Sequence, residues 1–135
     1  MYKRQHWNEF HDAAVEVIAQ GLIDLGVLKG ELREVLLDKT YAQYYMHKTG
    51  HWLGLDVHDC GDYSVDGLWV ELEAGMALTV EPGIYISDSS KAPKKYRGIG
   101  VRIEDDILVT KNGHQVLSSS VPKTIDEIEN LMSSC

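Results

Sequence analysis

Cysteine and proline are scarce in this 135-residue chain, which has two cysteines and three prolines. Cys60 and Cys135 are too few for the disulfide framework of a small secreted protein, and they cannot form a four-thiolate zinc site. Residues 1–6 include a basic pair, but no apolar segment follows it, so we expect no signal peptide. No apolar run approaches the roughly 18 residues of a membrane span. We therefore expect a cytoplasmic protein without a membrane segment.

Basic residues are also few compared with acidic residues. The chain has 13 Lys and Arg residues against 21 Asp and Glu residues, which gives a net charge of −8. This charge repels phosphate backbones and anionic lipids, so we expect neither nucleic acid nor a membrane surface as a partner. A hydrophobic share of 44% and a charged share of 25% are ordinary for a globular domain and argue against disorder. The length fits one domain with a core and excludes two full ones.

Three segments carry the pattern of helices. Residues 7–28 have apolar side chains at three- and four-residue steps, which predicts an amphipathic helix. Residues 31–37 predict a short second helix. Thr124 followed by Glu127 forms a capping signature, which predicts a closing helix over residues 124–132 with Ile128 and Leu131 on one face. The apolar side chains expected on the buried face of the first helix are Phe10, Ala13, Ala14, Val17, Ile18, Leu22 and Leu25.

Two segments carry the pattern of strands. Residues 76–86 are rich in β-formers, and Pro82-Gly83 interrupts them, which predicts a bend or bulge. Residues 100–110 form a second such run. The turn sequence Lys111-Asn112-Gly113 follows, and residues 114–117 could return as the paired strand of a hairpin. The predicted class is α+β, with helices and a mainly antiparallel sheet.

Three of the six histidines lie close together, at positions 47, 51 and 58. Neutral imidazole is a common transition-metal ligand, so a metal site is one interpretation. Gly50 and Gly54 favour a strand or loop over a helix, and in a strand His47 and His51 would face away from His58. The chain would then have to turn for all three to meet. The alternative is that they are surface histidines or hydrogen-bonded core histidines.

Two glutamates stand in apolar β-runs. Glu81 follows Leu-Thr-Val, and a glutamate is rarely buried unless it is paired or bound to metal. Glu104 follows Val-Arg-Ile, and in a regular strand it would share a face with Arg102 and Asp106. One interpretation of Glu104 is therefore a pair with Arg102 on a solvated face. The other is a metal site, since two carboxylates with a histidine suit manganese, cobalt, iron or zinc better than calcium or magnesium.

Three ordered strings, residues 47–61, 73–85 and 96–106, closely resemble the pita-bread metallopeptidases. The similarity is strongest to the Xaa-Pro aminopeptidase (aminopeptidase P) branch, with Xaa-Pro dipeptidase (prolidase) next. It spans nearly all of residues 7–132. The resemblance implies a curved, mainly antiparallel sheet with flanking helices. It also implies a metal-dependent hydrolase that releases the N-terminal residue of peptides with proline at the second position.

The resemblance also implies roles for individual residues. His51, Glu81 and Glu104 match metal ligands; Glu81 also matches a proton relay, and Glu104 matches the carboxylate that bridges two metals. His47 and His58 match histidines that contact the substrate, and Arg102 matches a site arginine. Two divalent ions are implied, Mn²⁺ first and Co²⁺, Fe²⁺ or Zn²⁺ as alternatives; such pairs activate water and polarise a carbonyl. Lys48 departs from the family pattern, which has a small residue after the first histidine.

Two further aspartate ligands are implied by the family but are not matched in this chain. Asp12, Asp24 and Asp38 fall in helical segments, and none fits the aspartate motif. We expect residues 1–135 to be the C-terminal portion of a pita-bread catalytic domain, with residues 1–5 foreign to it and the N-terminal half and an upstream domain absent. Alone, the chain is expected to be inactive. The alternatives are a prolidase or a non-catalytic pita-bread binding module, and the parent is expected to be a homo-oligomer.

Overall fold

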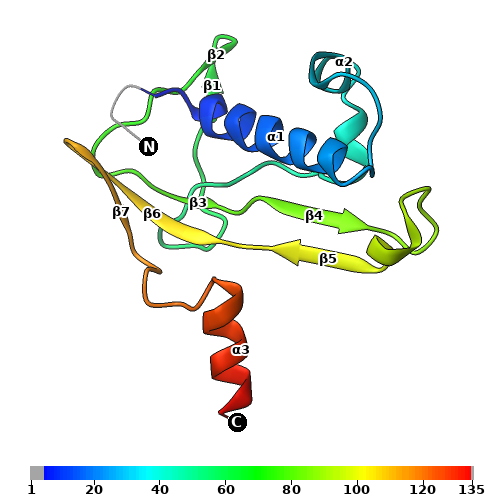
Figure 1. The fold of residues 1–135 in the computed structure, drawn as a ribbon. Helices are drawn as coiled ribbons and strands as arrows, with labels where there is room; N and C mark the ends of the chain where they lie inside the picture. Colours follow the sequence, from blue (N-terminus) through cyan, green and yellow to red (C-terminus); the bar gives the residue numbers. More distant parts are fainter. Residues whose placement is uncertain (1–4, 135) are drawn as a thin grey trace.

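A computed structural model describes residues 5–134 of the chain (Figure 1). The expectation for residues 1–5 therefore falls outside the described residues, except for Gln5. Helix α1 spans Trp7–Asp24, α2 spans Leu32–Leu37 and a 3₁₀ turn, η1, spans Thr40–Gln43. These elements confirm the two helices predicted for the first part of the chain. No helix among residues 5–134 has both the length and the apolar character that crossing a bilayer requires.

Helix α1 ends earlier than predicted, and its buried face is differently placed. Gly26 has a φ of 69°, and the N–H groups of Val27 and Leu28 both bond to the Leu22 carbonyl, which closes the helix with a left-handed glycine. The predictions for Ala13, Val17 and Leu25 were wrong, because all three residues are exposed, with Val17 at 73% and Leu25 at 47%. The buried residues of the helix are Trp7, Val15, Ile18, Ala19 and Leu22.

Within residues 5–134, seven short strands follow, all paired antiparallel. β1 (Ser64–Val65) and β2 (Leu68–Trp69) form a small hairpin. β3 (Ala77–Val80), β6 (Asp105–Thr110) and β7 (Gly113–Val116) form one sheet, in the order β3-β6-β7. β4 (Gly83–Ile86) pairs with β5 (Ile99–Arg102), and a 3₁₀ turn, η2 (Lys94–Tyr96), lies between them in sequence. The predicted hairpin after residue 110 is confirmed, as is the mixed class.

The run predicted over residues 100–110 is not one strand. It divides into β5 and β6, and residues 103 and 104 belong to neither. The expected interruption at Pro82-Gly83 does occur, between β3 and β4. Figure 1 shows β4 and β5 continuing the direction of β3 and β6 beneath α1, so two paired ribbons run end to end.

Two hydrophobic clusters hold the helices to the strands. One joins α1 to α2, Tyr44, Tyr45 and Ile86. The other joins Trp7 on α1 to Trp52, Leu72 and the inner faces of β3 and β6. Together they fix the segment that bears the three histidines between the helix layer and the strands.

Helix α3 spans Ile125–Ser133 and begins as predicted. The Thr124 hydroxyl accepts the Glu127 N–H at 3.3 Å, and the Glu127 carboxylate accepts the Thr124 N–H at 3.0 Å. Figure 1 shows the helix projecting away from the strands. Its apolar side chains are exposed, with Ile125 at 75% and Leu131 at 53%. The cap therefore comes from local sequence alone.

Candidate metal centre

The two candidate carboxylates lie where the strand pairing is interrupted. The β3–β6 ladder ends at the pair Val80↔Asp105, and the β4–β5 ladder begins at Gly83↔Arg102. Glu81 and Glu104 fall between these pairs, one on each side. Proline at position 82 has no N–H to donate, and its carbonyl accepts the Ile103 N–H at 3.3 Å. The break brings both glutamates to one place on neighbouring segments.

His51 reaches the same place from a third segment, which runs along the edge of β3 that does not pair with β6. The Glu81 N–H bonds to the Thr49 carbonyl at 2.6 Å, and the Thr79 N–H bonds to the His51 carbonyl at 3.0 Å. These bonds place the His51 side chain beside Glu81. The Nε2 atom of His51 lies 3.3 Å from Oε1 of Glu81.

His51, Glu81 and Glu104 form a group whose ligand atoms all lie within 4.8 Å of one another. A nitrogen or oxygen ligand lies about 2.0–2.2 Å from an ion such as zinc, so two ligands of one ion lie at most about 4.4 Å apart. The spacing of the three ligand atoms is close to this limit. One imidazole and two carboxylates are the donors that manganese, iron, cobalt and zinc accept. The residues present therefore fit a divalent transition metal.

The hydrogen bonding of His51 also suits a metal ligand. Its Nδ1 lies 2.9 Å from the Trp52 carbonyl oxygen, which can only accept, so Nδ1 carries the proton. In the neutral ring this leaves the lone pair on Nε2, the atom that faces Glu81. Metal-binding histidines commonly donate their other N–H in this way, because the bond fixes the tautomer and the ring orientation.

Glu81 is buried, and both of its carboxylate oxygens accept hydrogen bonds. It is 8% exposed, and Oε1 accepts the Thr79 hydroxyl at 3.1 Å while Oε2 accepts Nη1 of Arg102 at 3.1 Å. The bond to Glu81 raises the pKa of Arg102. The pairing of Arg102 with Glu104, one of the sequence-based interpretations, is thus replaced by a pairing with Glu81, because the strand is broken between residues 102 and 105.

The structure does not bring the three histidines to one point. His58 contacts His51, with ring centroids 4.3 Å apart and the rings nearly perpendicular. His47 lies instead beside two tyrosines: its Nε2 is 3.0 Å from the Tyr85 hydroxyl, and its ring packs edge-on against Tyr45. Only His51 belongs to the group with the two glutamates.

Several contacts of this region were not predicted from the sequence. The Tyr85 hydroxyl faces His47, and the Thr79 hydroxyl bonds to Glu81. Thr49 bonds through its hydroxyl to Nδ1 of His11 at 2.8 Å and to the Tyr45 hydroxyl. Burial raises the pKa of Tyr45, and the bond to Thr49 opposes it. Tyrosine and threonine look like ordinary strand formers in these runs, so only the fold reveals what they face.

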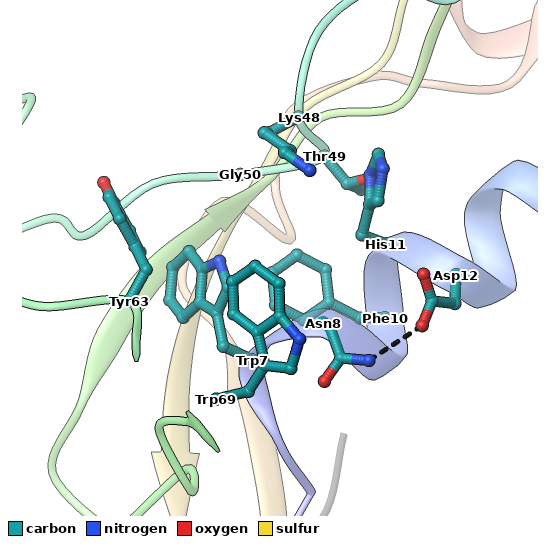
Figure 2. A pocket seen from close by; sticks show the side chains of 10 residues that line it. All are labelled: Trp7, Asn8, Phe10, His11, Asp12, Lys48, Thr49, Gly50, Tyr63 and Trp69. Carbon is teal, nitrogen blue, oxygen red and sulfur yellow. Dashed lines mark hydrogen bonds between the residues drawn. The ribbon is translucent and has the colours of Figure 1, made fainter. Parts of the chain in front are cut away.

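A separate aromatic pocket of about 610 Å³ lies between α1, the Lys48–Gly50 segment and the β1–β2 hairpin. Figure 2 shows Trp7, Phe10, Tyr63 and Trp69 around it, with Lys48 and His11 at one side. None of the three candidate metal ligands lines it. Burial lowers the pKa of His11, and the positive charge of Lys48 lowers it further. Lys48, which departs from the family pattern, is thus among the residues that line this pocket.

Comparison with known proteins finds relatives that are named Xaa-Pro aminopeptidase or aminopeptidase P. An Xaa-Pro aminopeptidase from Haemophilus influenzae is 52% identical over 122 residues, which cover 90% of this chain and 28% of that protein. The structure of Pseudomonas aeruginosa aminopeptidase PepP superposes with a TM-score of 0.96 and 55% identity over 99% of this chain and 30% of that one. A zinc-substituted aminopeptidase P from Escherichia coli in complex with product gives a TM-score of 0.93 and 44% identity, over 98% of this chain and 30% of that chain.

These superpositions confirm the pita-bread α+β fold expected from the sequence. The chain spans less than a third of the length of the relatives it matches. The sequence model of metallopeptidase family M24 matches residues 4–111, which is most of the chain. The chain belongs to metallopeptidase family M24.

Proposed function

We propose that these residues form part of the catalytic domain of a metal-dependent Xaa-Pro aminopeptidase. The observation that carries the proposal is the convergence of His51, Glu81 and Glu104 at the interrupted ladder. The M24 family uses divalent metal ions, and we propose Mn²⁺ here, with Co²⁺, Fe²⁺ and Zn²⁺ as alternatives. Relatives that carry the name Xaa-Pro aminopeptidase support the reaction class.

His51 would supply Nε2 and the glutamates their carboxylate oxygens as ligands. When bound, divalent metal ions activate water and polarise the scissile carbonyl of a peptide. Arg102 donates to Oε2 of Glu81, which orients that carboxylate and leaves Oε1 toward His51. The carboxylate of Glu81 is also the group that we propose to hold the proton taken from water.

We propose that His47 and His58 handle the substrate and the developing oxyanion. His58 stands edge-on against the ligand His51, and His47 shares a hydrogen bond with the Tyr85 hydroxyl. Donors placed beside a developing negative charge stabilise it strongly where water is excluded. We propose that the substrate is a peptide with proline at its second position.

The 135 residues offer three of the five ligands that the family resemblance implies. We therefore propose that they act together with a further segment that bears two aspartates, as the C-terminal portion of the catalytic domain. A homo-oligomeric parent and a cytoplasmic location stay predictions from the sequence.

The test is an activity assay on the parent protein that contains these residues. Loaded with Mn²⁺, it is expected to release the first residue of tripeptides with proline at the second position, and the Glu81→Gln variant is expected to lose this activity. Cleavage of Xaa-Pro dipeptides alone would identify a prolidase instead. No cleavage of either substrate, and no loss of metal binding in His51→Ala, would favour a binding module.

A further inference from the structure

Thr79 contacts both His51 and Glu81. Its hydroxyl oxygen accepts the His51 N–H at 3.0 Å and donates to Oε1 of Glu81 at 3.1 Å. Its own N–H bonds to the His51 carbonyl, also at 3.0 Å. We infer that Thr79 is a positioning residue, which sets the placement of these two candidate metal ligands relative to each other. This inference rests on the proposed function.

The bond to the His51 N–H replaces a bond of the ordinary ladder. In an antiparallel hydrogen-bonded pair, each residue donates its N–H to the backbone carbonyl of the other. Here the Thr79 N–H follows that rule, but the His51 N–H goes to the Thr79 side chain. The peptide that carries His51 is thus tied to a side chain, and the same side chain touches the carboxylate of the second ligand.

The direction of the hydrogen bonds follows from counting protons. A hydroxyl has one proton, and the backbone N–H of His51 can only donate. The Thr79 oxygen must therefore accept from His51, and its single proton is free to point at Glu81. An acceptor is required there, and the Oε1 atom of Glu81 supplies it. The two hydrogen bonds therefore run in one direction, from the backbone N–H of His51 through the Thr79 hydroxyl to the carboxylate of Glu81.

The residue type fits this task. Thr79 is 1% exposed, so neither of its hydrogen bonds can be exchanged for water without cost. The β-branched side chain restricts χ1, which holds the hydroxyl in one direction. Serine could make the same two bonds with a less restricted side chain. Valine would match the shape but would leave the part-buried His51 N–H without this acceptor and Oε1 of Glu81 without this donor.

Thr49 provides a matched control on a neighbouring segment. It is also 1% exposed and its hydroxyl is also hydrogen-bonded, but to His11 and Tyr45 rather than to a candidate ligand. A Thr49→Val variant loses a buried hydroxyl of the same kind, and the backbone carbonyl that accepts the Glu81 N–H is retained.

The experiment is a calorimetric titration of the 135-residue chain and its variants with Mn²⁺, with circular dichroism as a check of folding. Loss of a residue that orients a metal ligand typically lowers metal affinity about 10- to 100-fold, which is the loss expected for Thr79→Val. Thr79→Ser and Thr49→Val are expected to stay close to the wild type. Unchanged affinity in Thr79→Val, or an equal loss in Thr49→Val, would overturn the inference.

A second measurement tests the hydrogen bond between Thr79 and the His51 N–H. It needs no metal and does not depend on Thr79→Val, which could fail to fold. By NMR hydrogen exchange in the wild-type chain, the His51 amide is expected to be protected, and Thr79→Ser is expected to preserve that protection. Rapid exchange of the His51 amide in the wild type would contradict the role of Thr79. Failure of the wild-type chain to bind Mn²⁺ would instead contradict the proposed metal centre, while the exchange result would still decide on Thr79.

Discussion

Gly50 lies so close to Thr79 that a Cβ atom built at position 50 would be 2.0 Å from the Thr79 carbonyl oxygen. This contact explains why the residue before His51 is a glycine. The neighbouring atom belongs to the backbone of β3, which cannot turn aside as a flexible side chain could. The absence of a side chain at position 50 therefore lets the His51 segment lie against β3.

Gly50→Ala is expected to push the His51 segment away from β3. Overpacking of this kind typically costs about 1–3 kcal/mol of stability. We expect a lower free energy of unfolding in a urea titration, together with weaker binding of Mn²⁺, because His51 moves with its backbone.

Gly21→Ala is the control for this substitution. Gly21 lies within α1, and a Cβ there would meet no atom within 4 Å. Alanine is favoured over glycine in a helix by about 1 kcal/mol, so this variant is expected to gain stability and keep its metal affinity. Equal behaviour of the two variants would contradict the steric account of Gly50.

Glu127 carries a prediction about the start of α3. Hydrogen bonds from the Thr124 and Lys123 N–H groups and then from the Thr124 hydroxyl lower the pKa of Glu127 from 4.5 to about 2. The folded carboxyl thus binds its proton at lower pH than the unfolded one. Its contribution to the helix is present in full above pH 4.5 and is lost as the pH falls through about 2. An NMR titration of the Glu127 carboxyl carbon measures this directly, and a midpoint at 4.5 would show that the cap does not form.

His11 is expected to titrate below the usual 6.5, because burial and then Lys48 lower its pKa. The unfolded chain binds this proton at higher pH than the folded chain does. Stability is therefore expected to fall as the pH drops below 6.5. In an NMR titration, Lys48→Ser should raise the pKa of His11, whereas Lys94→Ser, at the exposed turn η2, should leave it in place. Equal effects of the two substitutions would rule out the influence of Lys48.

The 135-residue chain alone is expected to show negligible cleavage of Xaa-Pro peptides, even with added Mn²⁺. One histidine and two glutamates can hold a single ion weakly, and the resemblance implies a pair of ions with two aspartates. The assay compares release of the first residue by the purified chain with the buffer blank. Robust turnover that Glu81→Gln abolishes would show that the three ligands suffice.

Local signals in the sequence predicted much of the fold. Thr124 and Glu127 define a cap through bonds within one turn, so the start of α3 could be predicted from the sequence. Pro82 lacks an N–H, so the break between β3 and β4 was visible as well. The break at Ile103 and Glu104 was not, since isoleucine favours a strand and glutamate disfavours one only weakly. It arises because the paired segment opposite, at Glu81 and Pro82, is itself interrupted.

The residues of the candidate site likewise include some that could be predicted from the sequence and some that could not. Glu81 could be singled out because a carboxylate in an apolar run needs a partner. The partner itself, Arg102, depends on which strands pair. Thr79 was not predicted as a site residue because threonine is a common strand residue. Its hydroxyl gains a role only when His51 lies alongside it. Contacts between distant segments set these roles, and single-sequence patterns do not encode them.

We propose above that His51, Glu81 and Glu104 bind a divalent metal ion together. The decisive measurement is a calorimetric titration of the 135-residue chain with Mn²⁺, with His51→Ala and Glu81→Gln as the disrupting variants and His114→Ala on β7 as the control. The wild type and His114→Ala are expected to bind one ion, and the other two variants are expected to show no detectable binding. Binding that survives in His51→Ala and Glu81→Gln, or that is absent from the wild type, would contradict it.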